Sequence, residues 1–193
     1  MKKNVIALVL TAVVLFALAF GLNKEAGANA QEHHIWLMQT LLPGSEEFTL
    51  ETYSGEDANI RSVHKGETGF VIETVTWGYA GDSVMLIGVS KEGKVTGLTI
   101  RDMQETAGLG MQAMWDEQFL AQFLNTEGGV AIGTAGEDAF SGATGSDTTE
   151  TETYVDGISG ATVTSKAIAR CVNSAVAYVT GADVDSGATS WGG

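Results

Sequence analysis

The sequence predicts an α+β fold, an antiparallel or mixed sheet with packed helices, preceded by one N-terminal transmembrane helix. Three observations support this prediction. Residues 60–100 contain successive apolar runs that alternate as strands do, residues 164–179 carry an apolar stripe at helical spacing, and residues 5–22 are uninterrupted apolar or small. With 193 residues, of which 44% are hydrophobic, the chain has room for one packed domain beside the apolar segment.

The apolar run at residues 5–22 predicts a membrane anchor, because its 18 residues would span about 27 Å as a helix. Lys2 and Lys3 precede it, which places the N-terminus in the cytoplasm and the rest of the chain on the other side. A cleaved signal peptide is the alternative, since Ala28-Asn29-Ala30 has the form of a cleavage site. Either interpretation makes residues 31–180 an extracytoplasmic domain, followed by a flexible tail at 181–193.

Four strands and a first short helix are expected in the first half of the domain. The helix covers 35–42 and ends at Pro43-Gly44, and residues 45–58 are expected to be irregular. The clearest hairpin joins the last two apolar runs across the polar residues 90–94. The expected strands are 60–63, 69–77, 84–89 and 95–100.

Two further helices are expected in the second half. An amphipathic helix is predicted over 111–124, with its apolar stripe in the core: Met111, Trp115, Phe119, Leu120 and Phe123. The last helix is predicted over 164–179, and Cys171 lies on its apolar stripe, which indicates a buried and unreactive thiol. Short strands are expected at 130–132 and 154–155.

Composition excludes several classes of function. The formal net charge of −14 would repel a phosphate backbone, so no nucleic acid is expected as a partner. A single cysteine excludes a disulfide within the chain and any cysteine-rich metal centre. The histidines, His33, His34 and His64, have no second ligand pair at metal spacing, so no metal site is expected.

Residues 155–166 form the most informative segment, a loop of small residues that leads into the last helix. Gly157 and Gly160 would allow the backbone to approach a bulky group closely. The start of a helix presents free N–H groups and the positive end of its dipole, which favour a phosphate, and Lys166 adds a positive charge. The alternative is an ordinary Ser/Thr helix cap with no ligand.

The stretch Ser159-Gly160-Ala161-Thr162, with Asp156 before it, resembles the flavinylation motif of the FMN-binding domain family. The resemblance implies that a flavin transferase attaches FMN to Thr162 through a phosphoester. A second stretch, Glu105-Thr106-Ala107-Gly108-Leu109-Gly110, resembles the E-T-P-G-L-G motif of the family, with Ala107 in place of proline. The other residues that this resemblance places at the cofactor are Ser159, Gly160, Ala161, Thr164, Ser165, Lys166, Glu105, Thr106, Gly108, Leu109 and Gly110.

Together with the single N-terminal span, both motifs resemble the G subunits of Rnf complexes, the ion-translocating ferredoxin:NAD oxidoreductases. This resemblance implies an electron-carrying protein that has no complete activity alone and sits in the inner or cytoplasmic membrane. Its implied partners are the other Rnf membrane subunits, a flavin transferase and the lipid bilayer. The alternatives are a stand-alone membrane-anchored flavoprotein, the C subunit of a sodium-pumping NADH:quinone oxidoreductase, and a non-redox acidic surface protein.

The pattern D-x-x-S-G-A-T occurs three times, at Asp138–Thr144, Asp156–Thr162 and Asp183–Thr189. Only the middle copy leads into a periodic helix with a basic residue in its first turn. Thr162 is therefore the expected attachment site, and Thr144 is the second candidate.

Overall fold

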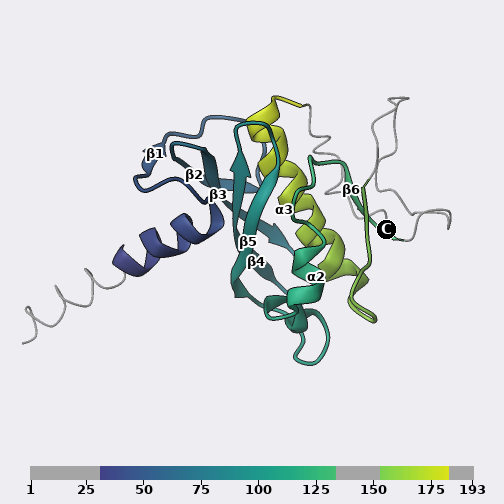
Figure 1. The fold of residues 1–193 in the computed structure, drawn as a ribbon. Helices are drawn as coiled ribbons and strands as arrows, with labels where there is room; N and C mark the ends of the chain where they lie inside the picture. Colours follow the sequence, from purple (N-terminus) through teal and green to yellow (C-terminus); the bar gives the residue numbers. More distant parts are fainter. Residues whose placement is uncertain (1–30, 134–152, 183–193) are drawn as a thin grey trace, which may run out of the picture. The chain divides into compact units, whose positions relative to one another are not determined.

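The computed structural model describes residues 31–133 and 153–182 (Figure 1). The chain divides into two compact units, residues 1–37 and residues 38–193. In the first unit, residues 31–37 are helical, and the His33 ring stacks on Trp36 with 5.6 Å between ring centroids. The predicted anchor at 5–22, the Thr144 and Thr189 copies of the motif and most of the predicted tail lie outside the described residues. Within the described ranges, no helix is long and apolar enough to cross a membrane.

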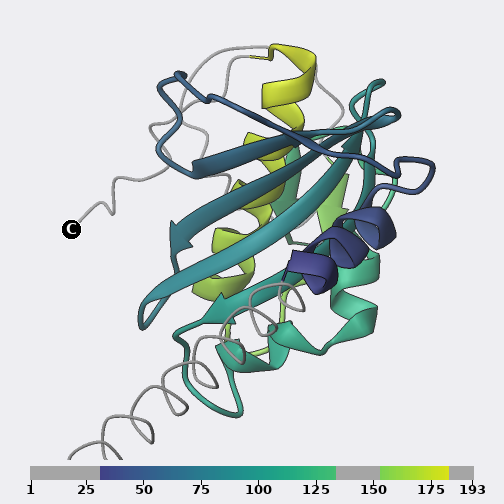
Figure 2. The same cartoon turned by 90° about the vertical axis from the view of Figure 1, so that its left-hand side faces the viewer.

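A five-stranded antiparallel sheet forms the frame of the second unit, with the strands in sequence order (Figure 2). The predicted strands are present, and β2, β4 and β5 each extend two or more residues beyond the predicted bounds. β1 was not predicted, because it lies within the acidic segment that was expected to be irregular. The strands are β1 (Thr49–Glu51), β2 (Ile60–Lys65), β3 (Gly69–Trp77), β4 (Asp82–Ser90) and β5 (Val95–Met103).

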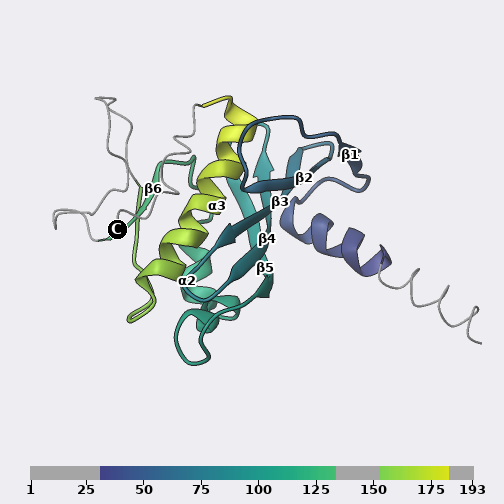
Figure 3. The ribbon, with the colours of Figure 1, turned by 180° about the vertical axis from the view of Figure 1, so that it is seen from behind.

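The helix α3 (Thr162–Thr180) packs across one face of this sheet, chiefly against β3 and β4 (Figures 1 and 3). Its apolar stripe is fully buried at Ile168, Val172 and Ala175, as the periodicity predicted. The helix ends where Gly181 adopts a left-handed φ of 70° and donates its N–H to the Ala177 carbonyl. The hydrophobic core of the unit includes buried residues of both α3 and the sheet, among them Ile72, Ile87 and Val172.

The opposite face of the sheet is approached closely by the backbone around Leu41, at the end of the helical residues 38–41. The Thr96 hydroxyl donates to the Leu41 carbonyl at 2.6 Å. A Cβ placed on Gly97 would lie 2.9 Å from the Leu41 Cα, and one on Gly88 would collide with the Leu41 carbonyl. Glycine on two neighbouring strands therefore admits this backbone.

The two short strands predicted near the end of the chain form a separate parallel pair, β6 (Val130–Ile132) with β7 (Thr153–Val155). The Asn173 side chain on α3 fastens β6, because it accepts from the Val130 N–H at 2.9 Å and donates to the Val130 carbonyl at 3.0 Å. β6 is thus held against α3 by this side chain.

The predicted helix over 111–124 is wrong. The segment contains a 3₁₀ helix η1 (Gly110–Met114) and a short helix α2 (Glu117–Ala121), interrupted at Trp115 and Asp116. Asp116 starts the second helix by accepting from the Phe119 N–H at 3.0 Å, which is a better use of an aspartate than a helix interior. Phe119 and Phe123 are buried, but Trp115 is 64% exposed and does not belong to the core.

We predict that Phe123→Ala lowers the free energy of unfolding by about 3–5 kcal/mol, because a fully buried ring is lost and a cavity remains. Trp115→Ala removes an exposed ring and should change the free energy of unfolding by less than about 0.5 kcal/mol. Urea unfolding of both variants, followed by circular dichroism, measures this contrast. Equal losses would show that both rings belong to one helical core stripe, as the periodicity suggested.

Candidate functional site

The start of α3 is open to solvent at Thr162. The residue before the helix is Ala161, and no side chain caps the first turn. Thr162 is exposed, whereas Thr164 and Ser165 are buried. The ordinary Ser/Thr cap is therefore not what the structure contains, and the first N–H groups of a 19-residue helix are left without a side-chain partner. A helix end of this kind favours an anionic group.

Ser165 shapes the loop that precedes the helix. Its hydroxyl donates to the Ala161 carbonyl at 3.0 Å and accepts from the Ile158 N–H at 3.0 Å. Gly160 adopts a φ of +75°, which a side chain would disfavour. These bonds fix the turn of the 159–162 motif, so Ser165 positions the loop from below while Thr162 lies on the surface.

The second predicted motif, residues 105–110, lies directly against the first. A Cβ placed on Gly160 would lie 3.3 Å from the Leu109 Cδ2. A Cβ on Gly110 would lie 2.5 Å from the Thr164 Oγ1 and 2.9 Å from the Glu105 Oε2. Two segments about fifty residues apart in sequence thus share one surface, as the resemblance implied.

Glu105 lies beneath this surface and links two of its loops. Its side chain is buried, and its Oε1 accepts from the Tyr79 N–H at 2.6 Å. Within the described ranges, no Lys or Arg forms a salt bridge with it. A Cβ on Gly78 would collide with the Glu105 carboxylate, so the turn at 78–81 approaches the loop only because Gly78 has no side chain. Glu105 therefore holds two loops together.

The outer surface of the site is made by the other members of the second motif. Thr106, Gly108 and Leu109 are exposed, and Gly108, at a φ of +79°, has no atom within 4 Å of where its Cβ would be. Lys166 is half-buried one turn into α3. The structure therefore brings all twelve predicted site residues together, with Glu105, Gly110, Ala161, Thr164 and Ser165 beneath the surface.

Sequence reasoning missed two aromatic residues next to this surface. Trp77 is 58% exposed and Tyr79 is 71% exposed, and both lie at the turn that Glu105 holds. They lie where the predicted strand 69–77 ends and before the next one, at 84–89, but a residue in such a connection gives no sign of which distant loop it meets. The signal that could have found them is a pair of large aromatic side chains in a glycine-flanked turn, where packing does not require them.

Comparison with known proteins identifies the family. The FMN-binding domain model matches residues 78–177, which contain both motifs and the turn between β3 and β4. This chain belongs to the FMN-binding domain family. The match includes Thr162 and every other residue of the candidate site.

Two proteins resemble this member of the family. The G subunit of the Na(+)-translocating ferredoxin:NAD(+) oxidoreductase complex of Acetobacterium woodii is 34% identical over 131 residues, which are 66% of this chain and 54% of that protein. The chain thus spans about half the length of that relative. The crystal structure of the C subunit of Na(+)-translocating NADH-quinone reductase from Parabacteroides distasonis superposes with a TM-score of 0.50 at 20% identity, covering 76% of this chain and 79% of that one. This second likeness shows a shared fold.

The residues at the start of α3 fit the phosphate end of FMN. The uncapped helix N-terminus supplies N–H donors, and Lys166 supplies a positive charge nearby. Gly108 and Gly160 leave room above the surface that side chains would otherwise fill. Within the described ranges, no group of three or more His, Cys, Asp or Glu side chains could hold a metal ion.

Cys171 is fully buried, as predicted, and this burial raises the pKa of its thiol to about 12. At pH 8 this thiol is protonated in the folded protein, and we predict that it does not react with a thiol reagent until the chain unfolds. The measurement is the rate of labelling with and without urea. Rapid labelling of the native protein would mean that α3 does not cover this residue.

We predict that Gly110→Ala lowers the free energy of unfolding by about 1–3 kcal/mol, because its Cβ would press on Thr164 and Glu105. Gly108→Ala is the matched variant in the same loop. It meets no atom, and only its left-handed backbone is strained, which costs about 1–2 kcal/mol.

FMN incorporation, rather than stability alone, distinguishes the two glycine variants. Gly110→Ala should also displace the 105–110 loop from α3 and reduce FMN incorporation, which the ratio of flavin to protein absorbance measures. Wild-type incorporation in Gly110→Ala would show that contact between the two motifs is not needed to load the cofactor.

Proposed function

We propose that this chain is the FMN-carrying G subunit of an Rnf-type complex and that FMN is joined to Thr162 through a phosphoester. The observation that carries the proposal is the exposed residue Thr162 at an uncapped helix start, bordered by the second family motif. The 34% identity to the Acetobacterium woodii protein supports the choice of complex. FMN supplies the redox chemistry when bound, and the chain supplies its position and electrostatic surroundings.

Each part of the site has a separate task in this proposal. Thr162 provides the oxygen of the phosphoester, while the N–H groups of the first turn and Lys166 face the negative phosphate. Leu109 provides an apolar contact for the ring, and Ser165 and Glu105 hold the two loops that present these groups. A covalent tether suits an electron relay, since the cofactor cannot diffuse away between turnovers.

The setting of the protein in the cell follows from the same proposal. Residues 5–22 anchor the chain in the cytoplasmic membrane, and the FMN domain lies on the extracytoplasmic side, where a flavin transferase loads it. The neighbouring Rnf membrane subunits deliver and accept its electrons. The C subunit of a sodium-pumping NADH-quinone reductase shares the fold, and the genes that accompany this chain distinguish the two.

We predict that Thr162→Ala abolishes covalent FMN, because the accepting oxygen is removed, while the stability changes little at an exposed residue. The full chain is co-expressed with a flavin transferase, and flavin fluorescence is read in a denaturing gel. Thr144→Ala and Thr189→Ala are the matched controls, since each removes the threonine of another copy of the motif. Persistent fluorescence in Thr162→Ala, or its loss in a control variant, contradicts the assignment.

A further inference from the structure

We propose that Gln122 is a positioning residue for the loading of FMN, because its side chain holds the start of the attachment loop, residues 156–161, beside Thr162. This inference rests on the proposed function, and it adds a residue that belongs to neither family motif. Gln122 lies at the end of α2, 34 residues before Asp156. It is exposed, so packing of the core does not require a glutamine at this position.

The amide of Gln122 forms a pair of hydrogen bonds with the backbone of Asp156. Its Oε1 accepts from the Asp156 N–H at 2.9 Å, and its Nε2 donates to the Asp156 carbonyl at 3.3 Å. An amide side chain carries an acceptor and a donor side by side, so it can bond a backbone as a neighbouring strand would. Because both bonds go to the backbone, the Asp156 carboxylate takes no part in them.

Gln122 contacts the edge of β7 that faces away from β6. The Val155 carbonyl accepts from the Gly133 N–H at 3.1 Å on the β6 side, and backbone groups alternate in direction along a strand. Asp156, one position later, therefore faces the other edge, where Gln122 lies. Asn173 bonds the far edge of the pair, at β6, in the same manner. Two amide side chains from two helices thus flank the strands that lead into the attachment loop.

The later part of the attachment loop is held by buried contacts. The Ser165 hydroxyl bonds both Ile158 and Ala161, and a Cβ placed on Gly157 would lie 2.7 Å from the Ile132 Cγ2. The bonds of Gln122, in contrast, are exposed to solvent. They can therefore be removed by a substitution that leaves the core intact.

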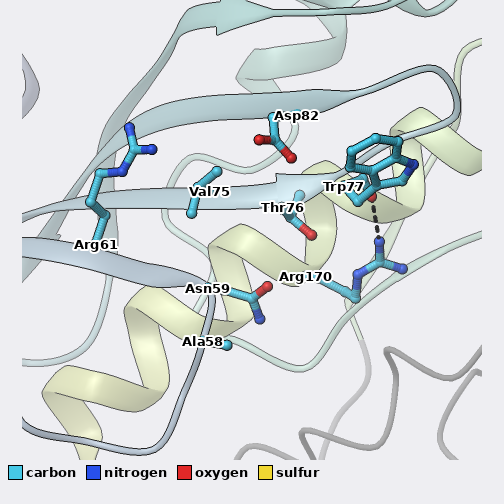
Figure 4. A pocket seen from close by; sticks show the side chains of 8 residues that line it. All are labelled: Ala58, Asn59, Arg61, Val75, Thr76, Trp77, Asp82 and Arg170. Atoms are coloured by element: carbon cyan, nitrogen blue, oxygen red, sulfur yellow. Dashed lines mark hydrogen bonds between the residues drawn. The ribbon is translucent and has the colours of Figure 1, made fainter.

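The helix that carries Thr162 is itself fixed, so it cannot follow a displaced loop. Arg170 lines a cavity of about 330 Å³ at the edge of the sheet, and its Nη2 donates to the Trp77 carbonyl at 3.2 Å (Figure 4). Its buried Nε has no hydrogen-bond partner among the described residues. One turn later, the Ser174 hydroxyl accepts from the Asn59 Nδ2 at 3.1 Å. The place of the attachment loop relative to Thr162 thus depends on contacts of the loop itself.

The backbone of Gln122 is fixed by buried neighbours. Phe119 and Phe123 are both buried, and their rings meet edge to face with 5.3 Å between centroids. After the helix, the Asn125 N–H donates to the Val95 carbonyl at 2.8 Å, which joins the segment to β5. The amide at the surface therefore projects from a rigid base, and it transmits that rigidity to Asp156.

A held loop favours loading because the flavin transferase must bind the segment around Thr162. In the transfer, the Thr162 oxygen bonds to the phosphorus of an FMN phosphoanhydride, the anhydride P–O bond breaks, its other half leaves as a phosphate ester, and the threonine proton is released. A loop that already has the required shape loses little conformational entropy when the transferase binds it. Without Gln122 this entropy is lost on binding, which weakens binding of the chain and leaves the chemical step unchanged.

The test measures FMN transfer to the purified full chain by a flavin transferase, read as flavin fluorescence of the protein in a denaturing gel. Gln122→Met keeps the length of the side chain and removes both hydrogen bonds. It should raise the KM for the chain about tenfold, the combined effect of two ordinary hydrogen bonds, with kcat unchanged. Gln118→Met is the matched control, since Gln118 is exposed one turn earlier on α2, and it should keep the wild-type KM.

Hydrogen exchange tests the contact itself, without transferase or cofactor. The Asp156 N–H should exchange about tenfold faster in Gln122→Met than in the unmodified chain, because its acceptor is lost. Gln118→Met should leave this exchange unchanged. A variant that merely unfolded part of the sample would lower the fraction of chains that can be loaded and leave the KM of the folded fraction as it was.

The outcomes separate this inference from the proposed function. If the unmodified chain accepts no FMN at Thr162, both are overturned. If it is loaded there, but Gln122→Met keeps the wild-type KM or loses only part of the loadable fraction, the positioning role alone is overturned. A raised KM with unchanged exchange at Asp156 also overturns it, since Gln122 would then contact the transferase directly. An equal rise in Gln118→Met has the same consequence, because the whole surface of α2 would be responsible.

Discussion

The packing of α3 against the sheet is the interaction on which the rest of the structure depends. Its buried face, including Ile168, Val172 and Ala175, lies against β3 and β4 and fixes the rotation of the helix about its axis. Fixing that rotation determines which residues of the first turns face solvent. Thr162 is thereby exposed, while Thr164 and Ser165 are turned inward to hold the loops. The exposure of the proposed attachment site is thus a consequence of how the core is packed.

A buried carboxylate extends this arrangement to the loops that contain no regular structure. Glu105 links the turn after β3 to the 105–110 loop, and Gly78 and Gly110 allow the close approach on either side of it. Glycine loses more conformational freedom on folding than any other residue, so it is favoured mainly where such an approach requires it. The two glycines at contacts between distant loops indicate that the surface around Thr162 is held in a fixed shape.

The sheet and the last helix were predictable because their signals are local. Alternation in 69–77 and 95–100, and the stripe from Ile168 to Val179, require no knowledge of distant contacts. The helix break at Trp115 and Asp116 was not predicted. The apolar spacing favours one continuous helix, whereas Asp116 favours the start of a new helix, and only tertiary packing decides between the two. β1 was missed because its three residues acquire strand structure only by pairing with β2.

The site was partly predictable for a similar reason. Both motifs are contiguous in sequence, so their residues were found, but the inward role of Glu105 and the unpaired Nε of Arg170 arise from contacts across the fold. Arg170 lies near the middle of α3, a helix that also contains Thr, Ser, Lys and Asn residues, and sequence alone gives it no role. The structure therefore separates two groups of residues: exposed ones that could contact a cofactor, and buried ones that hold the exposed ones in place.

The most direct test of the account is to find where the cofactor is attached in the unmodified protein. The chain is isolated from membranes of cells that hold a flavin transferase, digested, and its peptides are sequenced by mass spectrometry. The account predicts one peptide that carries the added mass of an FMN phosphoester on Thr162. The same mass on Thr144 or Thr189, or no modified peptide in protein that is loaded with flavin, would contradict it.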